Sequence, residues 1–131
     1  MVCLDTSFII ALIRRDPRAE KKLEEYVDRG LRLSTTPITA CELFKGAYRS
    51  KKKDVEVVKV REILSRLDIL DFSIDACEKY GKLVNDLERA GTPISDLDAI
   101  IASLALTHNE SLVTSDRENF ERISGLIIES W

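Results

Sequence analysis

The chain has 131 residues and a formal net charge of −3, with 44% hydrophobic and 33% charged residues. This length favours a single domain over residues 1–131, large enough to bury roughly two-thirds of its unfolded surface. The composition excludes an intrinsically disordered chain, no apolar run reaches the ~20 residues of a membrane span, and no secretory signal is visible. We therefore expect a globular, cytoplasmic protein.

The three cysteines are Cys3, Cys41 and Cys77, an odd number without C-x-x-C spacing. Each lies among apolar neighbours in the sequence, so we expect three buried, reduced thiols, as is usual in the cytoplasm. A structural zinc site is not expected, because His108 is the only histidine that could complete one.

Short apolar runs alternate with helical segments along the chain. The expected strands are residues 1–4, 31–33, 69–70, 112–114 and 126–128. The expected helices are residues 6–13, 16–30, 36–48, 54–67 and 73–90, a helix that holds Asp98 and ends near 107, and a turn at 117–122. This alternation predicts an α/β fold whose parallel sheet is covered by helices on both faces.

Four acids lie where expected elements begin or end, or among apolar residues. They are Asp5, Glu42, Asp98 and Asp116. Burying a carboxylate is costly unless it is paired or binds a cation, so acids in apolar surroundings indicate a site. Asp5 follows the first expected strand and Asp116 the fourth, and α/β sheets bind ligands beyond these carboxyl ends.

Three of these acids also have a purely structural interpretation. Asp5 can cap the helix that follows it, although the hydroxyl of Thr6 or Ser7 can also cap this helix. Glu42 can face solvent on an amphipathic helix, although its sequence neighbours are unusually apolar. Asp116 can cap the helical turn after it.

Asp98 can complete a capping box with Ser95, and this role is compatible with a site because carboxylates are favoured at helix N-termini. Asp96 competes with it as the acid that faces inward. Two positions on a helix differ by about 200° of rotation. One rigid helix therefore cannot point both acids inward.

Together the four acids meet the needs of a bound Mg²⁺ or Mn²⁺, which prefer oxygen ligands and can activate water against a phosphodiester. Without metal, the acids repel one another and at least one pKa should rise. We therefore expect metal to raise the melting temperature, and Asp98→Asn to stabilise the metal-free protein. Ser-His-Asp and Cys-His schemes are excluded, because His108 is the only histidine and lies at a helix end.

Short motifs spread over nearly the whole chain strengthen this interpretation. They are Leu4-Asp5-Thr6-Ser7, Thr39-Ala40-Cys41-Glu42-Leu43 with Gly46, Gly91-Thr92-Pro93-Ile94, Asp98-Ala99-Ile100-Ile101-Ala102 with Ala105, and Leu112-Val113-Thr114-Ser115-Asp116 with Phe120. In this order they resemble the PIN domain family, specifically the VapC-type toxins of toxin–antitoxin pairs. The resemblance implies a three-layer α/β/α fold with a parallel sheet of four to five short strands, and a metal-dependent endoribonuclease activity.

The resemblance also implies roles for individual residues. By position, Asp5, Glu42 and Asp98 match the three core acids of the family and Asp116 matches a more variable fourth. On this interpretation, Asp5, Asp98 and Asp116 position Mg²⁺ or Mn²⁺ and Glu42 ligates the ion or orients water, with one metal ion or two left open. The implied auxiliary residues are Thr6, Asp96, Thr114 and Ser115. Asp96 is an extra acid relative to the family pattern.

A basic segment follows Glu42 and carries no acid. Its cations are Lys45, Arg49, Lys51, Lys52 and Lys53. It can bind RNA phosphates, or it can be a solvated helix end and loop. The resemblance further implies a small cognate antitoxin and a homodimer. Two alternatives remain at this point, a PIN nuclease of RNA processing and a non-catalytic, metal-binding interaction module.

Overall fold

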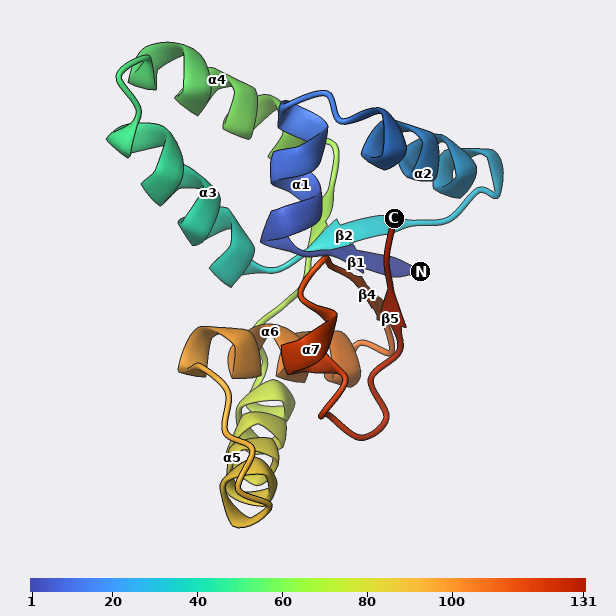
Figure 1. Ribbon diagram of the computed structural model, residues 1–131, viewed down its shortest axis with the longest axis vertical. Coiled ribbons are helices and arrows are strands. Elements are labelled where there is room, and N and C mark those ends of the chain that lie inside the picture. Colours follow the sequence, from blue (N-terminus) through green and yellow to red (C-terminus); the bar gives the residue numbers. More distant parts are fainter.

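The computed structural model describes residues 1–131 as seven helices and five strands (Figure 1). The strands are β1 (Val2–Leu4), β2 (Leu33–Thr35), β3 (Asp68–Ile69), β4 (Ser111–Val113) and β5 (Ile128–Glu129). The helices are α1 (Thr6–Ile13), α2 (Pro17–Asp28), α3 (Pro37–Arg49), α4 (Lys53–Leu64), α5 (Ile74–Arg89), α6 (Asp96–Thr107) and α7 (Arg117–Phe120). None of the helices is both long and apolar enough to cross a membrane.

The five strands form one sheet in the order β3-β2-β1-β4-β5, and every neighbouring pair is parallel. β1 lies at the centre, where Cys3 is paired with Ser34 of β2 and with Leu112 of β4. The predicted parallel sheet is therefore confirmed. Because all its strands run the same way, their carboxyl ends meet at one edge.

Helices cover both faces of the sheet, with α1 to α4 on one side and α5 to α7 on the other (Figure 1). Successive residues of β1 point to opposite faces, as the period of a strand requires. Val2 and Leu4 pack in the core beneath α1 to α4, with Phe8 and Tyr26. Cys3 packs in the second core, beneath α5 to α7. The three-layer α/β/α fold is confirmed.

Two strands, β2 and β5, begin two residues later than the sequence pattern predicts. Leu31 was expected to start a strand, but its amide bonds to the carbonyl of Tyr26 and closes the end of α2. Leu126 was expected in the last strand, but its amide bonds to the carbonyl of Ile123 in a turn. In both cases a local turn captures the backbone donor that the sheet would need.

The prediction for the cysteines was wrong for two of them. All three are free and Cys3 is buried, but Cys41 and Cys77 are exposed. Both exposed cysteines lie on helices, where each residue is rotated by about 100° from the next. Apolar sequence neighbours therefore did not indicate that these side chains face the core.

Candidate active site

The candidate acids come from both helical layers and from the sheet between them. Asp5 follows β1 and Asp116 lies just after β4, so the pairing of these strands brings their ends together. Glu42 comes from α3 on one side, and Asp98 from the first turn of α6 on the other. Segments far apart in the chain thus meet at the carboxyl edge.

Asp5 is the most enclosed of these acids, with 7% of its surface exposed. Burial raises the pKa of its carboxyl above the ordinary value, and the negative charges of Asp98 and Glu42 raise it further. Hydrogen bonds from the Thr114 hydroxyl, at 2.7 Å, and from the Thr6 backbone oppose this pKa shift. The carboxylate is therefore held in place by donors while its neighbours repel it.

The capping role considered for the side chains of Asp5, Thr6 and Ser7 was wrong, and the bonds that these side chains make instead explain how this edge is built. Asp5 itself occupies the N-cap position, and its side chain makes no capping hydrogen bond. Thr6 and Ser7 lie inside the helix, and their hydroxyls bond elsewhere. Thr6 Oγ1 donates to Glu42 Oε1 at 2.7 Å, so α1 fixes the side chain of α3 that carries the second acid.

Two hydroxyls tie the ends of β1 and β4 together. Thr114 Oγ1 donates to Asp5 and accepts the amide of Asp116 at 3.0 Å. Ser7 Oγ accepts the amide of Ser115 at 3.1 Å and lies 3.4 Å from Thr114 Oγ1. Ser115 thus joins the network through its backbone, while its side chain is exposed. Sequence reasoning considered Ser7 only as a helix cap.

Asp98 lies in the first turn of α6, and its amide donates to the Ser95 hydroxyl at 3.2 Å, as the predicted capping box requires. Its pKa is raised chiefly by burial and also by the charges of Asp116 and Glu42, while Ser95 opposes the rise. Asp116 makes no capping bond to α7; its Oδ2 accepts from Asn119 Nδ2 at 3.0 Å. Asn119 was missed, although its spacing of three residues from Asp116 was a possible signal.

Asp96 is placed differently from the other acids. It is exposed at the start of α6, and its carboxylate accepts a hydrogen bond from the Tyr80 hydroxyl of α5 at 2.9 Å. It does not contribute to the raised pKa of Asp5 or Asp98. The rotation between positions 96 and 98 thus separates the two acids, as their spacing predicted.

The donor chemistry of the four acids suits a hard divalent cation, because all of their ligating atoms are carboxylate oxygens. No three Asp, Glu, His or Cys side chains lie close enough together to ligate one ion directly in this arrangement. Mg²⁺ commonly binds through one or two carboxylates and keeps several waters. An open set of mutually repelling carboxylates fits such a water-rich ion better than a metal that needs a closed protein cage.

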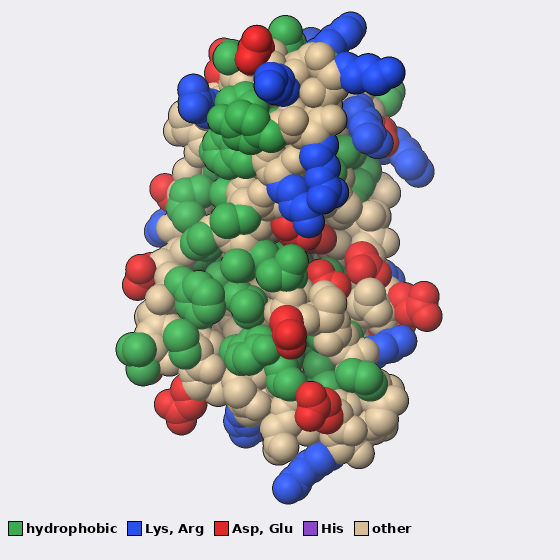
Figure 2. Space-filling model, turned by 90° about the vertical axis from the view of Figure 1, so that its left-hand side faces the viewer, with side chains coloured by type: hydrophobic (Ala, Val, Ile, Leu, Met, Phe, Trp, Pro, Cys, Tyr) green, Lys and Arg blue, Asp and Glu red, His purple; other side chains and the backbone are tan.

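The basic segment lies next to these acids in the chain. Lys45 and Arg49 are on α3, Lys51 and Lys52 are in the turn after it, and Lys53 begins α4. All five are exposed and none forms an ion pair. Figure 2 shows Lys and Arg side chains over the part of one face where α3 and α4 lie, with Asp and Glu side chains below them.

Known proteins are similar to this chain in sequence and in fold. The family model "PIN domain" matches residues 2–126. "Ribonuclease VapC2" of Rickettsia felis is 36% identical over 128 residues, which are 98% of this chain and 96% of that protein. "tRNA(fMet)-specific endonuclease VapC" of Salmonella typhimurium is 34% identical with the same coverage.

Solved structures give the same result. The complex VapBC2 of Rickettsia felis, bound to a promoter DNA fragment, holds a chain that is 34% identical, with a TM-score of 0.92 over 100% of this chain and 99% of that one. For VapBC-1 of nontypeable Haemophilus influenzae the TM-score is 0.89 at 33% identity, over 100% and 98% of the two chains. The chain belongs to the PIN domain family.

Proposed function

We propose that this chain is a metal-dependent endoribonuclease that hydrolyses RNA phosphodiester bonds, and that it acts as the toxin of a VapBC-type toxin–antitoxin pair. The observation that carries the proposal is the set of coupled carboxylates Asp5, Glu42 and Asp98 at the carboxyl edge of the sheet. The similarity to proteins named as VapC ribonucleases, over almost the whole of both chains, supports it.

The acidic residues have two roles in this proposal, which are to bind the metal ion and to position water. Asp5, Asp98 and Asp116 would hold Mg²⁺ or Mn²⁺ in part through the waters that the ion keeps, and the ion would supply an activated water and neutralise charge on the phosphodiester. Thr114 fixes the rotamer of Asp5, and Asn119 fixes that of Asp116. Thr6 fixes Glu42 through one carboxylate oxygen, which leaves the other free to orient water or accept its proton.

RNA is attracted to this acidic edge by the neighbouring cations. Because Lys45, Arg49, Lys51, Lys52 and Lys53 carry no ion pairs, they are available to bind phosphates. Each phosphate contact that is lost should reduce the salt slope of RNA binding by roughly one. Replacing the three consecutive lysines with Ser should therefore flatten the dependence of RNA affinity on salt concentration. An unchanged slope would remove the segment from the substrate path.

Two surfaces are suited to protein partners. A cavity of about 800 Å³ between α1, α2 and α4 has apolar walls that include Leu23, Val27 and Ile63, and we propose that it receives the antitoxin. Apolar side chains also gather on the face in Figure 2. Tyr48 and Ile69, which line one apolar hollow of the surface, are 59% and 48% exposed, and we propose that this hollow pairs with a second copy of the chain.

The test is cleavage of total tRNA and ribosomal RNA with Mg²⁺ or Mn²⁺, with EDTA as the metal control. Asp5→Asn and Asp98→Asn should each abolish cleavage. Asp75→Asn is the matched control, because Asp75 is also an acid in the first turn of a helix, but of α5, and should cleave like the wild type. Cleavage that survives both site variants would refute the proposal. Inactivity of the wild type on many RNAs with saturating Mn²⁺ would favour a binding module.

A further inference from the structure

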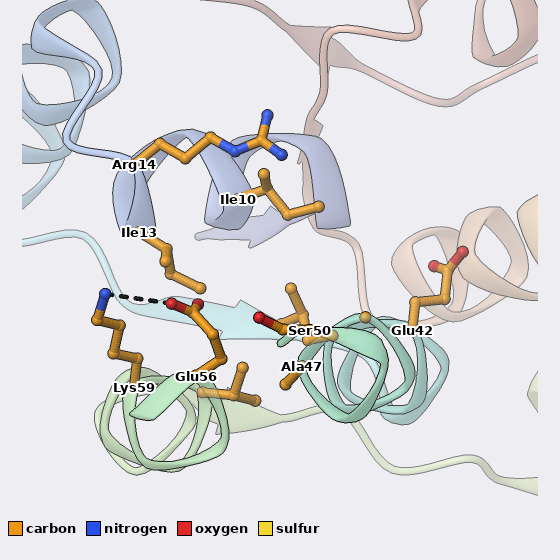
Figure 3. Close-up of a pocket in the computed structure, with 11 residues that line it drawn as sticks. Ile10, Ile13, Arg14, Glu42, Ala47, Ser50, Glu56 and Lys59 are labelled. Carbon is orange, nitrogen blue, oxygen red and sulfur yellow. Dashed lines mark hydrogen bonds and ion pairs between the residues drawn. The ribbon is translucent and has the colours of Figure 1, made fainter. Parts of the chain in front are cut away.

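A cavity of about 440 Å³ opens beside Glu42, between α1, α3 and α4 (Figure 3). Its walls are apolar and face each other across the opening. They are formed by Ile10 and Ile13 of α1, Leu43 and Ala47 of α3, and Val60 of α4. Ser50 and Glu56 add oxygens to the lining, and Lys59 lies with Glu56 at the end away from Glu42. The lining of the cavity thus combines apolar and polar side chains.

Gly46 lines this cavity from the middle of α3. Its backbone is not in the left-handed region, so the conformation does not require glycine. A Cβ atom at this position would meet no atom within 4 Å, so packing does not require glycine either. Glycine weakens a helix interior relative to alanine. The absent side chain therefore leaves open space at this wall of the cavity.

The dimensions and polarity of the cavity fit a single nucleotide. Small-molecule sites of this size have apolar walls and a few polar groups that fix orientation. Aliphatic side chains on facing walls suit the faces of a base. The Glu56 carboxylate accepts N–H groups, although it is paired with Lys59 at 3.3 Å, where the Lys59 side chain is 49% exposed and that of Glu56 29% exposed. Arg14 is exposed at the rim without an ion pair and can bind a phosphate.

We propose, on the basis of the function proposed above, that this cavity binds an unpaired base of the RNA next to the phosphodiester that is cut. Proteins read single-stranded RNA by splaying bases out and bonding to their edges. Guanine fits best, because two adjacent N–H donors on its Watson–Crick edge match one carboxylate, here that of Glu56. The occupant is RNA rather than a protein segment because Glu42, a candidate catalytic acid, lines the same cavity.

Two glycine substitutions separate this role from an effect on the fold. Gly46→Ala adds one methyl group to the cavity. Gly81→Ala adds the same group in the interior of α5, where a Cβ also meets no atom within 4 Å. Both variants should melt at or above the wild-type temperature. In kcat/KM for RNA cleavage, Gly46→Ala should lose roughly 10-fold, the effect of one methylene in a fitted pocket, and Gly81→Ala should lose nothing.

Binding is measured separately from cleavage by titrating GMP, AMP, CMP and UMP onto ¹⁵N-labelled protein. GMP should shift the amide signals of Ala47 and Ser50 most, and Gly46→Ala should weaken that binding roughly 10-fold. The proposal is overturned if none of the four nucleotides shifts these amides while the protein still cleaves RNA. It is also overturned if Gly46→Ala cleaves like Gly81→Ala, whether or not it loses affinity for a co-purifying antitoxin. Binding of GMP without any nuclease activity would refute the proposed function and leave the nucleotide site standing.

Discussion

The substitution Thr114→Val tests whether a buried hydroxyl holds the charge of Asp5 in place. Thr114 is fully buried, and its hydroxyl donates to Asp5 Oδ2 at 2.7 Å and accepts the amide of Asp116 at 3.0 Å. Valine has the same shape but makes neither hydrogen bond. Thr35→Val is the matched control, because Thr35 is equally buried and its hydroxyl donates at 2.7 Å to the neutral carbonyl of Leu4.

The two substitutions should differ in size. A hydrogen bond to a charged group contributes about 1.5–3 kcal/mol to stability and one to a neutral group about 1 kcal/mol. At a sensitivity of roughly 3–5 °C per kcal/mol for a chain of this length, Thr114→Val should lower the melting temperature by about 5–15 °C and Thr35→Val by about 3–5 °C. The amide of Asp116, left without its acceptor, adds to the first value.

They should also differ in their dependence on pH. The Thr114 hydrogen bond lowers the pKa of Asp5, so it stabilises the charged carboxylate. The destabilisation by Thr114→Val is therefore complete above the raised pKa of Asp5 and decreases as the pH falls through it, whereas that of Thr35→Val stays constant. Chemical denaturation at several pH values, from the ordinary pKa of an aspartate at about 4 up to neutral pH and above, measures both. Equal pH profiles for the two variants would refute the reasoning.

Three further predictions follow from the same geometry. Asp98→Asn should raise the melting temperature of the metal-free protein near neutral pH, because it removes one of the mutually repelling charges, and a lower value would contradict the crowding. In melts without metal, the raised pKa values of Asp5 and Asp98 stabilise the folded protein fully at pH values below the ordinary pKa of an aspartate, and this stabilisation is lost as the pH rises through the raised pKa values. Asp98→Asn should flatten this dependence of the melting temperature on pH, and saturating Mg²⁺ should offset the loss of stability. Tyr26→Phe removes the buried hydroxyl that donates to Glu129 at 2.7 Å and should cost about 1–3 kcal/mol in urea unfolding. Tyr48→Phe, at an exposed tyrosine, should leave the free energy of unfolding unchanged. Equal effects of Tyr26→Phe and Tyr48→Phe would show that the hydrogen bond between Tyr26 and Glu129 does not hold β5 in place.

The placement of the acids could be predicted because it depends on a general property of parallel sheets. Asp5 and Asp116 each follow a strand, so their meeting at one edge requires no knowledge of side-chain conformation. The long helix α5 could also be predicted from the sequence, because Ser73 caps its start and Gly91, with a φ of +73°, follows its end. In both cases the signal lies in a few consecutive residues.

Other features depend on contacts that no local pattern contains. The hydroxyl of Thr114 reaches Asp5 across 109 positions of sequence, and only the pairing of β1 with β4 brings them together. The start of β2 was misplaced because the end of α2 competes for the amide of Leu31. The exposure of Cys41 depends on how α3 is rotated against its neighbours, which the residues beside it do not reveal.

The central position of β1 has a consequence for how the protein is made. A ribosome makes the chain from the N-terminal side, so β1 and Asp5 appear before β4, and Asp5 precedes Thr114 by 109 positions. Until β4 takes its place, Asp5 lacks the hydroxyl that orients it, and one side of the central strand is unpaired. A nascent chain therefore cannot assemble the acidic edge. On the function proposed above, activity would therefore begin only after β4 has been made and has paired with β1.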